Sequence, residues 1–161
     1  MTASEFNTCV DQHSDALFRF VVKNLKDRDA ARDVVQDTFE KMWLKVEQVA
    51  FKKSKSYLFT TGYHTMIDKI RKEQRSGLLE DHHVDLVRTE NSFSDLGALL
   101  EKALNTLNEV QRSVIMLRDY EGYSYDEIGE ITGLNESQVK VYIYRARLSL
   151  KNYLGNMEQI L

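Results

Sequence analysis

The sequence predicts an all-α protein built from two small helical domains. Proline is absent from the 161 residues and only seven glycines occur, so few positions would interrupt a helix. Apolar residues recur mostly at intervals of three and four, which places them on one face of a helix. A chain of this length can form one domain or two small ones. A long polar stretch in its middle favours two.

The first two predicted helices lie near the N-terminus. One carries an apolar stripe over residues 17–25, and the other carries a stripe over residues 31–43, after a polar break at residues 26–29. We expect the second stripe to turn Phe39 and Trp43 mainly into the core. The outer face of the same helix presents acids and an amide, namely Asp33, Gln36, Asp37 and Glu40.

A third helix is predicted to begin near Ser54 and to end in the basic run RKEQR. One face is apolar, and the other offers cations and aromatic rings: Lys53, Lys55, Tyr63, His64, Lys69, Arg71, Lys72 and Arg75. This mixture suits single-stranded DNA, because bases stack on rings while cations follow the backbone. A solvated helix face with its aromatics turned into the core fits the pattern equally well.

The predicted domain boundary falls in a polar, acidic stretch without sustained periodicity. It divides the chain into a first domain over residues 1–76, a linker over residues 77–95 and a second domain over residues 96–161. His82 and His83 are neighbours in this linker, so their side chains cannot share a helix face. We therefore interpret them as solvated residues and predict no metal site.

The second domain is expected to open with helices over 96–107 and 110–120. Asn108 and Gln111 have the spacing of a capping box at the start of the second of these. A further pair of short helices follows in the stretch from Gly122 to Leu148, and it forms the most informative feature of the chain.

Each helix of that pair has its own start signal. Ser124 stands three residues before Glu127, and Asn135 stands three before Gln138, so both starts have the partners of a capping box. Gly133 lies between the helices, where a left-handed backbone conformation costs glycine little. Apolar residues at helical spacing can join the two helices in one core. The arrangement predicts a helix-turn-helix, whose second helix can enter a DNA major groove.

The outward face of the second helix supports DNA binding. At helical spacing it presents small, aromatic and basic side chains: Ser137, Lys140, Val141, Tyr144, Arg145, Leu148 and Lys151. Such groups suit base edges and phosphates. A two-helix packing corner in a protein that never contacts DNA gives the same pattern, so this motif alone leaves both possibilities open.

The net charge of −3 hides two basic segments. Residues 51–76 contain seven Lys and Arg against two Asp and Glu, and residues 139–161 contain four against one. Phosphate binding depends on such local patches. The acidic remainder should weaken non-specific DNA binding, as expected of a protein that binds DNA only together with a partner.

Other function classes find no support in the sequence. No apolar run approaches the roughly 18 residues of a membrane span, and no secretory signal is evident. The single cysteine fits a reducing compartment. We find no phosphate-binding loop, no metal-ligand spacing and no nucleophile beside a base. The chain is therefore expected to be cytoplasmic, without a cofactor and not an enzyme.

Three motifs together carry a resemblance to a family. DRDAARDVVQDTFEKMW (residues 27–43) resembles the region 2 core helix of bacterial sigma factors, and YLFTTGYHTMIDKIRKEQR (57–75) resembles their promoter-melting helix. Residues 104–154 resemble region 4. With no region between them, the chain is similar to the extracytoplasmic-function (ECF) sigma factors, and the resemblance leaves out only the first dozen residues and the linker.

The resemblance implies partners for each surface. Core RNA polymerase would bind Asp33, Gln36 and Asp37. The melted −10 promoter element would contact the third helix and the loop before it, through Lys52, Lys53, Lys55, Tyr63, His64, Lys69, Arg71 and Lys72. The −35 duplex would contact Ser137, Gln138, Lys140, Val141, Tyr144 and Arg145.

The chain departs from the family pattern at two places that read promoters. Tyr63-His64 replaces a common Arg-Asn, and Lys140-Val141-Tyr142 replaces a common Lys-Ser-Arg. The base preferences of relatives therefore do not carry over. The resemblance also implies an anti-sigma partner and a free protein that is monomeric. The alternatives are a conventional helix-turn-helix regulator with a sensing or dimerising domain, and a helical adaptor that does not contact DNA.

Overall fold

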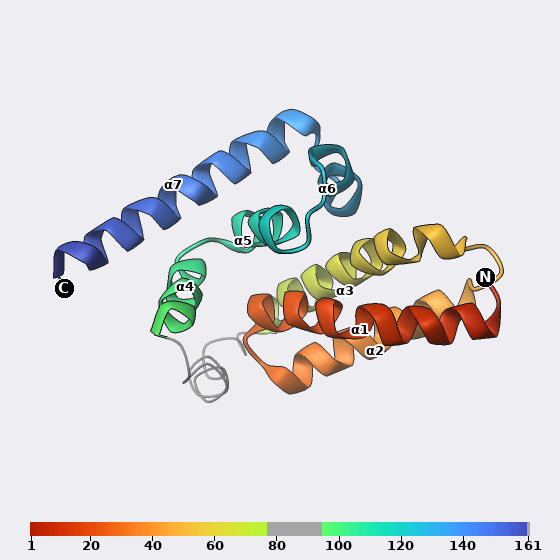
Figure 1. Ribbon diagram of the computed structural model, residues 1–161. Coiled ribbons are helices and arrows are strands. Elements are labelled where there is room, and N and C mark those ends of the chain that lie inside the picture. Colours follow the sequence, from red (N-terminus) through yellow and green to blue (C-terminus); the bar gives the residue numbers. More distant parts are fainter. Residues whose placement is uncertain (77–94, 161) are drawn as a thin grey trace. The chain divides into compact units, whose positions relative to one another are not determined.

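The computed structural model of the chain describes residues 1–76 and 95–160. Every regular element in these ranges is a helix (Figure 1), which confirms the all-α prediction. The elements belong to two compact units, Met1–His83 and Val84–Leu161, and each is described by itself. The predicted linker, with His82 and His83, lies outside the described residues except at its last position.

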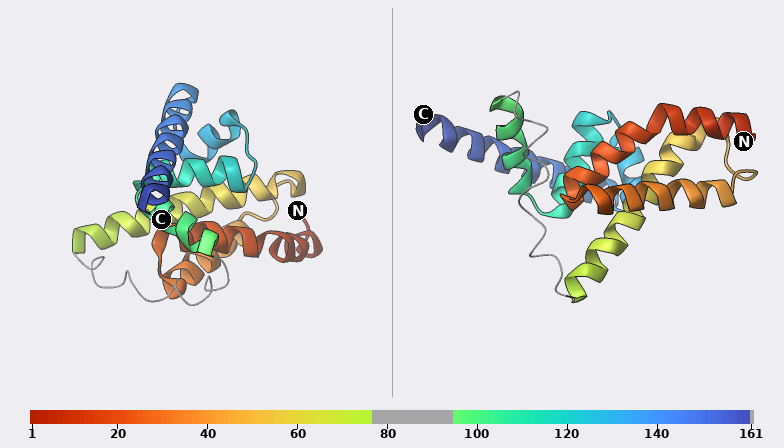
Figure 2. Two further views of the ribbon diagram at one scale, coloured as in Figure 1. Left: turned by 60° about the vertical axis from the view of Figure 1, so that its left-hand side comes forward. Right: turned by 90° about the horizontal axis from the view of Figure 1, so that it is seen from below.

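The N-terminal unit consists of three long helices and one short turn of 3₁₀-helix. They are α1 (Ala3–Leu25), α2 (Arg28–Leu44), η1 (Phe51–Lys53) and α3 (Ser54–Ser76). The three long helices lie side by side and pack against one another in pairs. Figure 2 shows the C-terminal part of α3 running past the other two. That projecting part carries the basic run predicted from the sequence.

Local signals explain where these helices begin and end. Thr2 and Glu5 form a capping box at the start of α1, with the Thr2 side chain accepting a hydrogen bond from the Glu5 amide. Lys26 ends α1 in a left-handed conformation with a φ of 60°. The Asp27 carboxylate then accepts hydrogen bonds from the first amides of α2. Because of its capping box, α1 starts well before residue 17, where the predicted apolar stripe begins.

The core of this unit is closely packed where α1 and α3 meet. Leu17 and Phe20 of α1 and Leu58, Phe59 and Met66 of α3 are fully buried. Their contact depends on the small residue Gly62, because a Cβ atom there would lie 2.8 Å from the Cδ1 atom of Leu17.

Cys9 is completely buried in the same unit. Burial raises the pKa of its thiol, and a hydrogen bond with Ser54 lowers that pKa by a smaller amount. Because the thiolate is the reactive form, both its burial and its raised pKa make this cysteine inert in the folded protein.

The C-terminal unit contains shorter helices followed by one long helix. They are α4 (Asp95–Asn105), α5 (Glu109–Ile115), η2 (Met116–Tyr120), α6 (Tyr125–Thr132) and α7 (Glu136–Ile160). The helix predicted over 110–120 is in fact divided, because α5 continues into the single π-helical stretch η2. Asn108 caps α5 by accepting a hydrogen bond from the Gln111 amide, as the sequence predicts. Among these elements α5 packs most extensively against α7.

Arg112 holds the turn between α4 and α5. Its side chain is 7% exposed, and it donates hydrogen bonds to the carbonyl oxygens of Leu104 at 3.1 Å and Leu107 at 2.7 Å. Desolvation lowers the pKa of this guanidinium, and the nearby Glu109 charge partly opposes that shift. The Arg112 guanidinium thus binds backbone carbonyl groups at the C-terminal end of α4 and in the turn that follows.

Candidate DNA-binding and polymerase-binding surfaces

The helix-turn-helix is assembled by two complete capping boxes. The Ser124 hydroxyl accepts from the Glu127 amide, and the Glu127 carboxylate accepts in return from the Ser124 amide, which starts α6. Asn135 and Gln138 make the equivalent pair of hydrogen bonds at the start of α7, at 2.8 and 3.0 Å. Both starts confirm the prediction from the sequence.

The turn between α6 and α7 is tight. Gly133 ends α6 in the left-handed region with a φ of 81°. A Cβ atom on Gly129 would lie 2.8 Å from the carbonyl oxygen of Leu134. The turn packs closely against α6 because Gly129 lacks a side chain, whereas Gly133 supplies the left-handed backbone. Ile128, Ile131, Val139, Ile143 and Ala146 then pack as one buried core.

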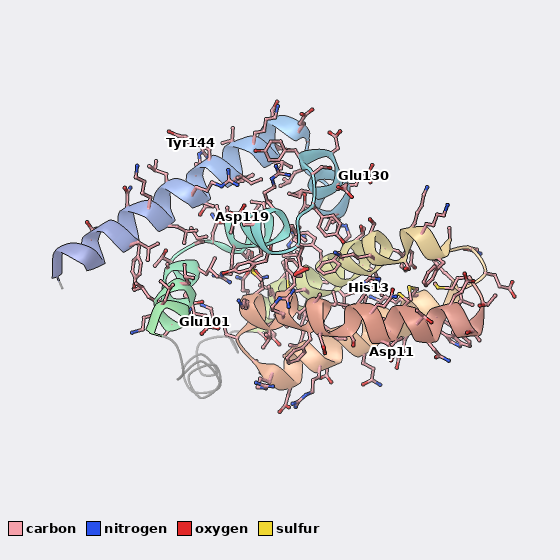
Figure 3. All side chains as sticks on the ribbon, viewed as in Figure 1. Asp11, His13, Glu101, Asp119, Glu130 and Tyr144 are labelled. Atoms are coloured by element: carbon pink, nitrogen blue, oxygen red, sulfur yellow. The ribbon has the colours of Figure 1, made fainter. Side chains whose placement is uncertain are left out.

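The outer face of α7 is exposed, as predicted. Tyr144 is 68% exposed and points away from α5 in Figure 3, and Val141 and Leu148 are 44% and 45% exposed. Ser137, Gln138, Lys140 and Arg145 are exposed on the same helix. The Oε1 atom of Gln138 accepts from the Asn135 amide, so this side chain also caps the helix.

Lys140 and Arg147 each form an ion pair with an acid while remaining exposed. The Nζ atom of Lys140 lies 3.2 Å from Oε1 of Glu136, and an Arg147 nitrogen lies 2.8 Å from Oδ1 of Asp119. The hydrogen bond with Asp119 raises the pKa of Arg147. Arg147 thereby connects α7 to η2.

A tyrosine lies between cations from η2 and α7. The guanidinium of Arg118 stacks 4.7 Å from the centre of the Tyr125 ring, and Nζ of Lys140 lies 6.0 Å from it. Arg118 also donates to the carbonyl oxygen of Tyr123 at 2.9 Å. These contacts orient the first turn of α6 relative to the start of α7, and no sequence pattern predicted them.

The basic face of α3 is present, with one correction. Lys52, Lys53, His64, Arg71 and Lys72 are exposed, and Lys55 and Lys69 are partly exposed. Tyr63 was predicted on this face, but it is only 6% exposed. It lies on the buried stripe of the helix, four residues after Phe59 and three before Met66, and packs in the core. Its ring edge contacts that of His64, with centroids 5.5 Å apart.

The acidic face of α2 is exposed as predicted. Asp33, Gln36 and Asp37 all face solvent, and Gln36 donates a 3.3 Å hydrogen bond to Glu40 one turn later. Asp33 is three residues from Gln36 and four from Asp37, so they form one stripe. The buried Ala31, Thr38 and Met42 lie on the other side of the helix.

Trp43 corrects a second expectation, because its side chain is 48% exposed and does not serve mainly the core. It follows Met42, which occupies the buried position, and is followed by Leu44, which is 84% exposed. The Phe6 ring covers part of Trp43 with centroids 5.0 Å apart, and it also contacts Phe39. The Thr2–Glu5 capping signal could have revealed this early helical turn.

Comparison with known proteins identifies both units. The model of Sigma-70 region 2 matches residues 9–76, and the model of Sigma-70 region 4 matches residues 98–150. The RNA polymerase sigma factor SigV of Bacillus subtilis is 31% identical over 142 residues, which cover 86% of this chain and 84% of SigV. The chain is an ECF RNA polymerase sigma factor.

Other relatives agree with this assignment. The ECF sigma factor SigE of Mycolicibacterium smegmatis is 30% identical over 91% of the chain, which spans 60% of that longer protein. Among solved structures, the sigma factor RpoE in complex with the anti-sigma factor NepR from Bartonella quintana superposes with a TM-score of 0.81. It is 28% identical, and the match covers 95% of this chain and 98% of RpoE.

As a sigma factor, the protein is a transcription initiation factor that directs RNA polymerase to promoters. A conventional helix-turn-helix regulator is not favoured, because the N-terminal unit matches Sigma-70 region 2 and not a sensing domain. No helix within residues 1–76 and 95–160 has the length and apolar character to cross a membrane. The same described ranges contain no cluster of three or more His, Cys, Asp or Glu suited to a metal ion.

Proposed function

We propose that the N-terminal unit of this sigma factor binds core RNA polymerase through α2 and the −10 element through η1 and α3. The observation that carries the proposal is the separation of charge within one three-helix unit. Acids and an amide form the stripe on α2, whereas the exposed residues of η1 and α3 are mainly cations. Two partners of opposite charge can therefore bind the unit at once.

The polymerase contact consists of Asp33, Gln36 and Asp37. Carboxylates one turn apart on a rigid helix can form charge-assisted hydrogen bonds with Arg and Lys of a partner. The melted −10 strand would follow Lys52, Lys53, Lys55, His64, Lys69, Arg71 and Lys72. Tyr63 is left out of this contact because it is buried.

The −35 contact is made by α7 in the major groove. Lys140 and Arg145 would supply charge, Ser137 and Gln138 hydrogen bonds, and Val141 and Tyr144 apolar contact with base edges. Val139, Ile143 and Ala146 bury the opposite face of this part of α7, which leaves Tyr144 and Val141 exposed for such a contact.

An anti-sigma factor is the expected regulator. RpoE was solved with NepR, and CnrH, which matches with a TM-score of 0.68 and 26% identity over 94% of this chain, was solved with the cytosolic domain of CnrY. We propose that this chain is bound in the same general way, is monomeric when free, and acts in the cytoplasm, where polymerase and promoter DNA are found. The chemistry of transcription belongs to the polymerase.

Run-off transcription tests the proposal. Core polymerase is supplied with genomic promoter fragments, with and without this protein, and promoter-specific transcripts should depend on it. Transcripts that appear equally without it would refute the assignment.

Charge reversal tests the polymerase contact separately. Asp33→Lys combined with Asp37→Lys should abolish binding to core polymerase, because it repels a basic partner surface. The matched control is Asp11→Lys with Asp15→Lys, which makes the same charge change at exposed positions of α1. Circular dichroism checks that both variants fold, and unchanged binding of the α2 variant would contradict the assignment.

A further inference from the structure

The recognition helix begins with an acid, although most of its length is basic. Glu136 is the first residue of α7 and is exposed. The next carboxylate along the helix is Glu158, whereas the residues between them include four cations: Lys140, Arg145, Arg147 and Lys151. The N-terminal end of a recognition helix is the end that contacts base edges. A lone acid therefore stands at the end of the helix that faces the base edges.

The Glu136 side chain has a defined position. Its Oε1 atom lies 3.2 Å from Nζ of Lys140, one turn further along the same face, and the two side chains are 58% and 55% exposed. The Lys140 ammonium also lies 6.0 Å from the centre of the Tyr125 ring. The carboxylate is thus held by a cation that the first turn of α6 helps to position, and it still has oxygen lone pairs open to a further donor.

A carboxylate in the groove has two opposite effects on DNA binding. It repels phosphates on every sequence, and it accepts a hydrogen bond from the exocyclic amine of cytosine, the base edge that suits Glu and Asp. Together these effects penalise all sequences except those that place a cytosine opposite the acid.

We propose that Glu136 is a specificity-determining residue that selects a cytosine at one position of the −35 element. The proposal rests on the proposed contact between α7 and that element. Lys140 serves as its positioning partner, because the ion pair restrains the carboxylate at the helix end. This role differs from the apolar and basic readout assigned to Val141, Tyr144 and Arg145.

A randomised −35 library, transcribed by the holoenzyme, tests the proposal. The wild-type protein should enrich cytosine at one position by roughly 5- to 150-fold, the range for one good base contact. Glu136→Gln should weaken that preference while keeping the others, because a neutral amide oxygen is a poorer acceptor than a carboxylate. Glu130→Gln is the matched control, because it removes one exposed carboxylate from α6 (Figure 3) and should leave every preference unchanged.

A base analogue then tests the hydrogen bond itself. Replacing the selected cytosine by pyrimidin-2-one, which lacks the exocyclic amine, should weaken wild-type binding more than Glu136→Gln binding. Both proteins bind the same altered base pair, so the difference between their losses of affinity reports the contact between residue 136 and the cytosine amine. Equal weakening in both proteins, or a Glu136→Gln variant that only gains affinity equally on all sequences, would overturn the proposal.

The outcome is separable from that of the proposed function. Promoter-dependent transcription by the wild-type holoenzyme supports the sigma role, whatever the base counts show. If such transcripts form but no −35 position responds to Glu136→Gln, only the role of Glu136 is refuted.

Discussion

For two aromatic side chains, the sequence pattern did not predict correctly whether the ring is buried or exposed. Tyr63 and Trp43 are both aromatic residues near charged neighbours, and each has the opposite exposure from the one predicted. Trp43 directly follows the buried Met42, so it lies about 100° from that core position around α2. Tyr63 lies within the buried stripe of α3, between Phe59 and Met66, although the predicted basic face included it.

Arg112 is expected to be the most important buried cation of the C-terminal unit. Arg112→Met should lower the free energy of unfolding by about 2–4 kcal/mol, because it leaves the buried Leu104 and Leu107 carbonyl oxygens without the guanidinium donors. Hydrogen exchange of the α5 and α7 amides measures this change. Lys102→Met, at an exposed position of α4, should change it by less than about 0.5 kcal/mol.

Tyr123 should make stability fall at high pH. It is 4% exposed, and burial raises the pKa of its phenol, with a smaller contribution from the charges of Glu121 and Glu127. The stabilisation is fully present below the ordinary pKa of about 10. Above it, the unfolded chain ionises while the folded one stays protonated, so stability decreases by up to about 1.4 kcal/mol per pH unit.

The Tyr123→Phe variant isolates this contribution from those of the other tyrosines. Denaturant unfolding of both proteins between pH 8 and pH 11 should show a steeper loss in the wild type above pH 10. Parallel curves across that range would contradict the assignment.

The helical elements were predicted well where a capping signal marks them. Ser124, Asn108 and Asn135 each precede a helix that begins where expected, because their side chains bind amides only three residues away. The start of α1 was missed although Thr2 and Glu5 carry the same signal, since the apolar pattern there is weak. The π-helical stretch η2 has no comparable local signature, because it arises from the packing of α5 against other helices.

The turn between α6 and α7 depends on the backbone of one residue. Gly133→Ala should destabilise the C-terminal unit by about 1–2 kcal/mol, because a Cβ atom is disfavoured in the left-handed region. Gly133→Asn should cost less, since asparagine adopts that conformation more readily. Thermal unfolding followed by circular dichroism measures both.

Gly155→Ala is the control of opposite sign. Gly155 lies within α7 with a helical backbone, and a Cβ atom there would contact nothing within 4 Å. Its replacement should stabilise the helix by about 0.5–1 kcal/mol. A Gly133→Ala variant as stable as wild type would show that the turn can relax.

At the scale of the whole molecule, the proposed function depends on two units that each carry a DNA-binding surface. The sequence predicted both units because each contains its own apolar pattern and charged surface. The surroundings of the recognition helix could not be predicted in detail, because contacts such as Arg147–Asp119 join residues that are distant in the sequence.

The net charge of −3 should weaken DNA binding by the free protein, because DNA is also negatively charged. We expect it to bind a promoter duplex at least about 100-fold more weakly than the holoenzyme does, because the polymerase raises the effective concentration of one unit once the other is bound. Fluorescence anisotropy at one fixed salt concentration compares the two. A free protein that matches the holoenzyme would instead favour a self-sufficient DNA binder.

The burial of Cys9 makes the chain convenient for site-directed chemistry. It is the only cysteine and is wholly enclosed by the N-terminal unit, so the native protein offers thiol reagents no accessible target. A cysteine introduced at an exposed position such as Tyr144 or Asp37 could carry a photo-crosslinker or a fluorophore without prior removal of the natural one. The promoter and polymerase neighbours of each surface can then be mapped one residue at a time in an otherwise unmodified sigma factor.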